Sequence, residues 1–286
     1  MQKAFMTVPE QDSWMRYFEQ WVLEREQEGS TLSASSLNVY RAMWRALGRR
    51  LPLNDVAPEV LTEDQVGLAL DSLKLEAQPR RRYLQLLSRV LGESSAAAHL
   101  LVQSPPPPRR PPSVLPGPFE QALTERMAAY STRQQLLVAL VLGAGLRAGE
   151  ASQVRWGDLR LEPELPWLVA RRKSGEPIRS TPIAPWAVPY LEASMPTSGD
   201  LEVYVFDNGH GAPVAASTLW RDCEALVSPV LGTGKLAGMT RLRNTYGLRN
   251  LANGKPLPEV REWLGHHQES TTARLLPFIP PRQKAV

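Results

Sequence analysis

The stretch LGAGLRAGEASQVRWGDL, residues 142–159, decides which fold the rest of the chain adopts. Gly143 and Gly145 interrupt the apolar run of residues 136–146, so one helix is expected to end there. Arg147 then stands at the start of the next helix, where the positive helix end favours a bound anion. The stretch predicts an arginine presented to an anion, the alternative being that Arg147 simply pairs with a nearby carboxylate.

A second arginine-containing stretch lies close to the C-terminus. It is TRLRNTYG, residues 240–247, and the turn Asn253-Gly254 and the segment VREWLGHHQESTTARL, residues 260–275, follow it. Pro258 is expected to open a short helix that Gly265 closes, because proline suits a first helical turn and glycine a helix end. The two stretches bring charged residues to helix ends, where backbone groups also face a ligand.

A proline-rich segment divides the chain. SPPPPRRPP, residues 104–112, cannot lie inside a helix or sheet, because proline lacks the backbone N–H, and it predicts a stiff extended linker. Before it, apolar residues recur at helical spacing in four or five segments. After it, two strands are expected around a turn at residues 173–176, within further helices. We therefore predict a mainly α chain with a small β-hairpin and three parts: residues 1–103, a linker at 104–116, and residues 117–286.

Composition favours a polyanionic partner. The 286 residues carry a formal net charge of +4, the pI is near 9.3, and arginine, which grips phosphate oxygens in a bidentate way, predominates over lysine. A single cysteine excludes a disulfide framework, and four scattered histidines suggest neither a metal site nor a cofactor. The longest apolar run is too short to cross a bilayer and the N-terminus lacks a signal core, so we expect a cytoplasmic protein without membrane contact.

These motifs resemble those of the tyrosine recombinase (phage integrase) family. Residues 142–159 are similar to the family's first arginine box, with Gly-Leu-Arg, a glutamate and a Trp-x-Asp. Residues 240–247 are similar to its second box, His-x-Leu-Arg-His-Thr-Phe-Ala, in which Thr240 and Asn244 replace the two histidines. The resemblance therefore implies a remnant phosphate-binding pocket, whose members are Arg147, Arg243, His266 of the Leu-Gly-His motif, and Lys173 or Arg172 of the hairpin.

The N-terminal part is similar to the family's core-binding, SAM-like helical domain, chiefly through residues 31–41. Arginines on one of its expected helices and just before another are candidates for phosphate and major-groove contact, although short arginine runs are usually solvated. The DNA-binding candidates are Arg41, Arg45, Arg49, Arg80, Arg81 and Arg82 here and Arg241 in the second box. Tryptophans at helical spacing in this part are expected to form its core.

In the family, two arginines hold the scissile phosphate, histidine and lysine move protons, and a tyrosine nine residues after the Leu-Gly-His histidine attacks the DNA. Here that count reaches Leu275, and no tyrosine follows Tyr246. Leucine has no lone pair, so it cannot attack. The hydroxyls of residues 270–272 are weak substitutes, and Ser270 is expected to cap a helix instead.

The resemblance implies a sequence-specific binder of double-stranded DNA that has lost catalysis. We expect it to recognise an attachment or target site of a mobile element and to recruit an active recombinase or transposase; its oligomeric state stays open. One alternative is an active recombinase whose nucleophile comes in trans from a partner. Another is a helical scaffold that does not bind DNA, which would lack salt-sensitive association.

Overall fold

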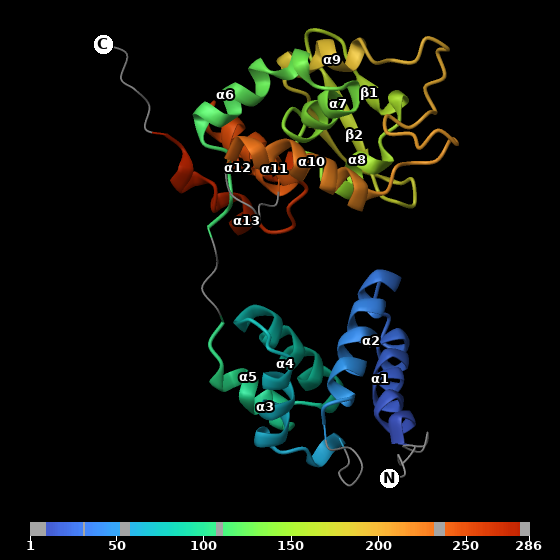
Figure 1. Ribbon diagram of the computed structural model, residues 1–286, viewed down its shortest axis with the longest axis vertical. Helices are drawn as coiled ribbons and strands as arrows, with labels where there is room; N and C mark the ends of the chain where they lie inside the picture. The colour runs from blue at the N-terminus through green and yellow to red at the C-terminus, as the bar shows by residue number, and fades with distance from the viewer. Residues whose placement is uncertain (1–9, 31, 52–57, 107–110, 232–237, 281–286) are drawn as a thin grey trace, which may run out of the picture. The chain divides into compact units, whose positions relative to one another are not determined.

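The computed structural model describes residues 10–30, 32–51, 58–106, 111–231 and 238–280. They belong to two compact units, residues 1–109 and 110–286 (Figure 1). The division between the units falls inside the segment predicted to be the linker. The predicted fold class, mainly α with a small sheet, is confirmed.

The N-terminal unit is a bundle of helices around an aromatic core. Trp14 and Trp44 stack with ring centroids 4.0 Å apart, and each indole N–H donates to the backbone carbonyl of the other residue, at 2.8 and 2.7 Å. Phe18 is fully buried beside them, so the predicted tryptophan core is confirmed. Its helices are α1 (Glu10–Gln27), α2 (Ala34–Gly48), α3 (Glu63–Ser72), α4 (Ala77–Leu91) and α5 (Ala96–Gln103), with a 3-10 turn η1 (Pro58–Val60).

The C-terminal unit packs helices around a small antiparallel sheet of order β1-β2-β3. Its α7 (Thr132–Val141) is apolar on nearly every face, as expected for a helix enclosed by others. The remaining elements are α6 (Gly117–Glu125), η2 (Met127–Ala129), α8 (Ala148–Gln153), η3 (Trp156–Asp158), β1 (Leu159–Arg160), β2 (Trp167–Arg171), β3 (Pro177–Pro182), η4 (Pro185–Ala187), α9 (Val188–Glu192), α10 (Ala216–Leu231), α11 (Gly238–Ala252), α12 (Leu257–Leu264), α13 (Glu269–Ala273) and η5 (Leu276–Phe278).

The predicted hairpin is present as β2 and β3, with Leu168 opposite Thr181. The short strand β1, which pairs Leu159 with Leu168, was not predicted, because two residues carry no periodicity. Helices do not resume steadily after residue 184: α9 has five residues, and residues 193–215 form turns and bridges before α10. As predicted, a short helix, α12, ends at Gly265, which caps it in the left-handed conformation at φ 58°.

Candidate phosphate-binding site

Arg147 is the N-cap residue of α8, directly after the glycine turn that ends α7. That turn needs glycine at position 145, where φ is 69° and the Tyr246 ring lies where a β-carbon would stand, 2.5 Å away. The Arg147 side chain is 45% exposed. It donates to Glu150 at 2.7 Å and to the carbonyl of Gly265 at 2.7 Å, so the predicted pairing with a carboxylate is present alongside an open face.

Glu150 is the centre of the site. Its side chain is 6% exposed and receives bonds from Arg147, from Arg179 at 2.6 Å and from the backbone N–H of Arg147 at 2.8 Å. Arg243 lies 3.8 Å away. Burial alone would raise the pKa of Glu150, but the Arg179 charge and hydrogen bond, the backbone bond and the Arg243 charge lower it overall. The carboxylate is therefore ionised and fixes three guanidinium groups.

Arg243, on α11, is buried and donates to the carbonyl of Gly145 at 2.5 Å and to that of Leu264. Burial and then the nearby Arg147 charge lower the pKa of Arg243 to about 9, against the opposing effect of Glu150. Its guanidinium links the end of α12 to the turn before α8. The structure thus brings the two predicted arginines together.

Arg179 on β3 completes the group, and the sequence analysis did not select it. Its side chain is 7% exposed, and it donates to Glu150 and to the carbonyls of Gly145, at 3.3 Å, and Trp263. The available signal was strand alternation, because residues 179 and 181 share the inward face of β3. A charged residue on an inward strand face indicates a buried ion pair.

We call Arg147, Arg179, Arg243 and Glu150 the arginine clamp. Two guanidinium groups bond to one carboxylate and the third lies 3.8 Å from it, so the four side chains carry a net charge of 3 − 1 = +2. The other hydrogen-bond partners of the three guanidinium groups in the described structure are neutral carbonyls. Bidentate guanidinium groups suit phosphate oxygens, so the clamp can hold a tetrahedral anion at the exposed face of Arg147.

His266 lies beside the clamp, and its Nδ1 is 2.9 Å from the hydroxyl of the buried Thr272. Burial first, and then the charges of Arg243, Arg147 and Arg179, lower the pKa of His266 to about 4. The ring is therefore neutral at pH 7. It can donate or accept one hydrogen bond there, according to its tautomer.

The two altered histidine positions face elsewhere. Thr240 is exposed, and the Asn244 amide donates to the carbonyl of Ser113, at 2.9 Å, at the end of the linker segment. Arg241, a DNA-binding candidate, donates to the Ser113 hydroxyl at 2.8 Å. Arg241 and Asn244 of α11 thus bind the end of the linker segment. In the described structure, neither of these two side chains bonds to a clamp residue.

Lys173 and its alternative Arg172 are both exposed at the hairpin turn. No bond from either side chain to a clamp residue is present in the described structure. A lysine at the tip of a two-stranded hairpin can approach a ligand only when the hairpin and ligand meet, so its place in the pocket stays a prediction.

Leu275 is 1% exposed in an apolar cluster with Tyr246, Leu251, Val260 and Leu264. A β-carbon on Gly247 would meet its side chain at 3.0 Å, so the leucine packs tightly against α11. It precedes η5, and α13 already ends at Ala273. Leu275 therefore faces the core of the unit.

The side-chain hydroxyls of residues 270–272 make no hydrogen bond to a clamp residue in the described structure. Thr272 is buried against His266, while Ser270 and Thr271 are exposed. The prediction that Ser270 caps a helix is wrong: α13 begins at Glu269 with Gln268 as N-cap, because Ser270 falls inside the first turn. Tyr246 is also occupied, since its hydroxyl contacts Thr181 at 2.9 Å and burial raises its pKa to about 12.

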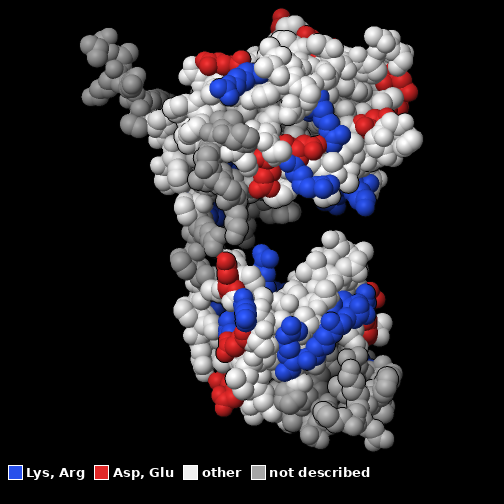
Figure 2. All heavy atoms as spheres, in the orientation of Figure 1, with Lys and Arg blue, Asp and Glu red and all other residues white. Residues whose placement is uncertain are grey.

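In the N-terminal unit, several DNA-binding candidates form internal bonds. Arg41 pairs with Glu19 at 3.1 Å, Arg80 pairs with Asp71, and Arg81 donates to carbonyls at the end of α5. The exposed candidates without a described ion pair are Arg45, Arg49 and Arg82. Figure 2 shows Lys and Arg side chains gathered in a band on one face of this unit.

The ends of the sheet and helices of this unit gather three arginines around one carboxylate. The model of the phage integrase family matches residues 119–275. The chain belongs to this family. Among the described residues, no helix is both long and apolar enough to cross a membrane.

Curated relatives match about half of the chain. Tyrosine recombinase XerD of Lacticaseibacillus casei is 31% identical over 146 residues, which are 49% of this chain and 48% of that protein. Tyrosine recombinase XerA of Pyrococcus horikoshii is 27% identical over 151 residues, 50% of each chain. The matched region spans about half the length of these relatives.

Solved structures share the fold over more of the chain. The Tn1549 transposon integrase in complex with a circular intermediate DNA aligns with a TM-score of 0.70 and 15% identity, covering 92% of this chain and 94% of that one. A lambda integrase dimer bound to a COC' core site aligns with a TM-score of 0.68 and 15% identity, covering 96% and 97%. At such identities the likeness establishes the fold alone.

Proposed function

We propose that this protein binds double-stranded DNA through the arginine clamp without cutting it. The observation that carries the proposal is the contrast at one site: the clamp retains its three arginines, while Leu275 lies in the apolar core. A side chain without a lone pair cannot form a covalent link to phosphorus. Phosphate binding needs only the charges and donors, which the clamp has.

DNA-bound structural relatives support the binding half of the proposal. The related structures named above are of proteins in complex with DNA, and this chain shares their fold. The exposed arginines of the N-terminal unit add positive charge outside the clamp. Each phosphate that such a group neutralises releases counterion, so affinity should fall steeply with salt.

The finer proposal is that binding is sequence-specific and serves a mobile element. A family member without a nucleophile can still mark an attachment site and recruit an active recombinase or transposase to it. This role fits a conserved fold with an unreactive position at residue 275. The resemblance of the motifs and the family membership support it.

The test begins with selection of bound duplexes from a random and genomic pool, using the full chain. Each selected duplex is incubated with the protein and analysed on a denaturing gel. We expect salt-sensitive binding of a defined sequence and no protein-linked strand. A linked strand with the protein alone would contradict the inactive assignment, and a linked strand only after a partner recombinase is added would favour a nucleophile in trans.

A matched pair of variants tests the clamp. Arg147 and Arg133 are both ion-paired arginines of the C-terminal unit, with side chains 45% and 44% exposed. We expect Arg147→Ala to weaken DNA binding by about 1–3 kcal/mol and to lower the salt slope by about 1, because it removes one charged phosphate contact. Equal loss in Arg133→Ala, measured by fluorescence anisotropy, would place the effect outside the clamp.

A further inference from the structure

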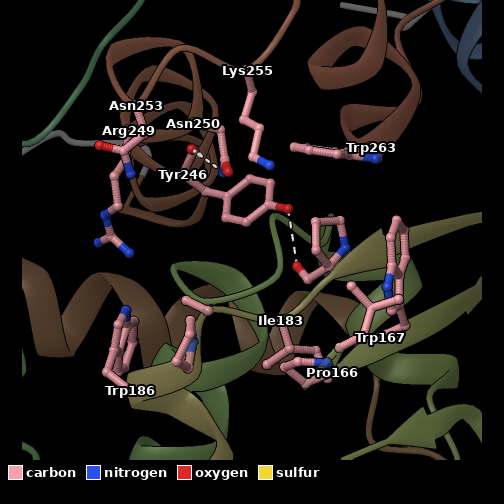
Figure 3. A pocket seen from close by; sticks show the side chains of 14 residues that line it. Pro166, Trp167, Ile183, Trp186, Tyr246, Arg249, Asn250, Asn253, Lys255 and Trp263 are labelled. Carbon is pink, nitrogen blue, oxygen red and sulfur yellow. Dashed lines mark hydrogen bonds between the residues drawn. The ribbon is translucent and has the colours of Figure 1, made fainter. Parts of the chain in front are cut away.

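The C-terminal unit also has a hollow whose described lining contains none of the clamp residues. It has a volume of about 500 Å³ and lies among the start of β2, the end of β3, η4 and the ends of α11 and α12 (Figure 3). Trp167, Trp186 and Trp263, all half-buried, form its walls. The rings of Trp167 and Trp263 meet edge to face, with centroids 6.2 Å apart at an angle of 81°. The hollow therefore has a largely apolar lining that includes three tryptophan rings.

Positive groups stand beside these rings. The Arg249 guanidinium lies 5.7 Å from the centroid of the Trp186 ring, and the Lys255 ammonium lies 6.0 Å from that of Trp263. Arg249 is neutralised by an ion pair with Glu120, whereas Lys255 is exposed and has no ion pair with a described residue. Lys255 thus supplies an uncompensated charge at the edge of the hollow.

The described lining of the hollow carries no negative charge. No aspartate or glutamate is among the described residues that line it. The indole N–H groups of Trp167 and Trp186 are buried and have no hydrogen-bond partner among the described residues. Both nitrogens are closed to solvent, so the donor that an occupant of the hollow can reach is the exposed Lys255 ammonium.

These features specify the chemistry of an occupant. The volume falls within the range of about 300–1,000 Å³ that holds small ligands, and tryptophan walls favour a flat ring. The Lys255 ammonium, without an acidic side chain in the described lining, favours an occupant with negative charge and repels a cation. We propose that this hollow binds a small aromatic carboxylate, with its ring among the tryptophans and its carboxylate at Lys255. This inference does not rest on the proposed DNA function.

The test uses two matched probes with the full chain, 2-naphthoate and its uncharged counterpart 2-naphthamide, each titrated by calorimetry. They share a ring system and differ in charge. We expect naphthoate to bind about fivefold or more tightly than naphthamide, because one partly solvated ion pair is worth that factor. Equal affinities, or no naphthoate binding at millimolar concentration, would overturn the proposal.

Variants locate the bound probe. Lys255→Gln should remove most of the preference for naphthoate, whereas Lys74→Gln, an exposed lysine of the N-terminal unit, should leave it intact. Equal effects of the two substitutions contradict the site. Excess inorganic phosphate should not displace naphthoate; displacement would place the probe in the arginine clamp instead.

A third arm separates a small-molecule site from a protein-docking surface. A synthetic peptide of residues 274–286 is titrated in the same way. Binding of this peptide with Lys255-dependent affinity, when neither naphthalene probe binds, would make the hollow a surface for a protein segment and overturn the proposal. Naphthoate binding that the peptide does not compete for supports it.

Discussion

The arginine clamp and the segment that carries Leu275 lie in one unit, but charged hydrogen bonds hold the clamp and apolar packing holds Leu275. Arg147 and Arg179 bond to Glu150, Arg243 lies within ion-pair distance of it, and all three donate to backbone carbonyls, so removing one group leaves others without their partner. Leu275 contributes only apolar packing. A charged network resists piecemeal change, whereas a packing position accepts any apolar side chain of suitable size. A substitution at residue 275 can therefore leave the contacts of the clamp unchanged.

The largest expected effect comes from breaking the network at its centre. Glu150→Gln should lower the free energy of unfolding by about 3–5 kcal/mol, because it leaves buried guanidinium groups without their carboxylate. The measurement is urea unfolding at neutral pH. Glu162→Gln, at an exposed position, is the control and should change stability little. A loss below about 1 kcal/mol for Glu150→Gln would mean that the carbonyls alone hold the arginines.

Truncating the packing position should cost somewhat less. We expect Leu275→Ala to destabilise the protein by about 2–5 kcal/mol, through lost burial and the cavity left behind. The adjacent Leu276 is 43% exposed, and Leu276→Ala should cost about 0.5 kcal/mol or less. Similar losses in both variants, measured by urea unfolding, would show that Leu275 does not belong to the core.

Restoring the hydroxyl sharpens the comparison further. Leu275→Tyr should overfill the cluster at a cost of about 1–3 kcal/mol and should not produce efficient strand linkage, since Thr240 and Asn244 lack imidazole groups. Denaturing gels with the selected duplex give the outcome, and Leu276→Tyr is the exposed control. Full recombination activity in the single Leu275→Tyr variant would refute the importance assigned to positions 240 and 244.

The remaining effect, which is seen only at acid pH, concerns His266. Its pKa is lowered to about 4, from an ordinary value of 6.5, by burial and the three clamp arginines. As pH falls below 6.5 the unfolded chain binds the proton first, so this contribution to stability is complete above 6.5 and is lost as pH falls toward 4. NMR titration of the His266 ring measures the pKa directly. A value near 6.5 would contradict the electrostatic coupling to the clamp.

Sequence reasoning anticipated the elements with strong local signals. The helix end at Gly143–Gly145, the β-hairpin and the short helix before Gly265 follow from glycine, proline and periodicity, and the structure contains each of them. It also anticipated the meeting of Arg147 and Arg243. It missed β1, because a strand of two residues has no periodicity, and it missed Arg179, because a single inward arginine leaves little local pattern. It also placed the cap of α13 at Ser270, whereas the cap is Gln268.

The sequence by itself determined that this chain has a mainly helical fold, two arginine motifs of the phage integrase family, and leucine at the position nine residues after His266. Tertiary structure alone decided that Arg179 joins the clamp, that Asn244 bonds to Ser113, and that Leu275 faces the core. The physical reason is the range of the interactions. Caps, turns and periodicity act over a few residues, whereas these contacts depend on how distant elements pack. They join β3 to α8, α11 to the end of the linker, and the residue before η5 to α11.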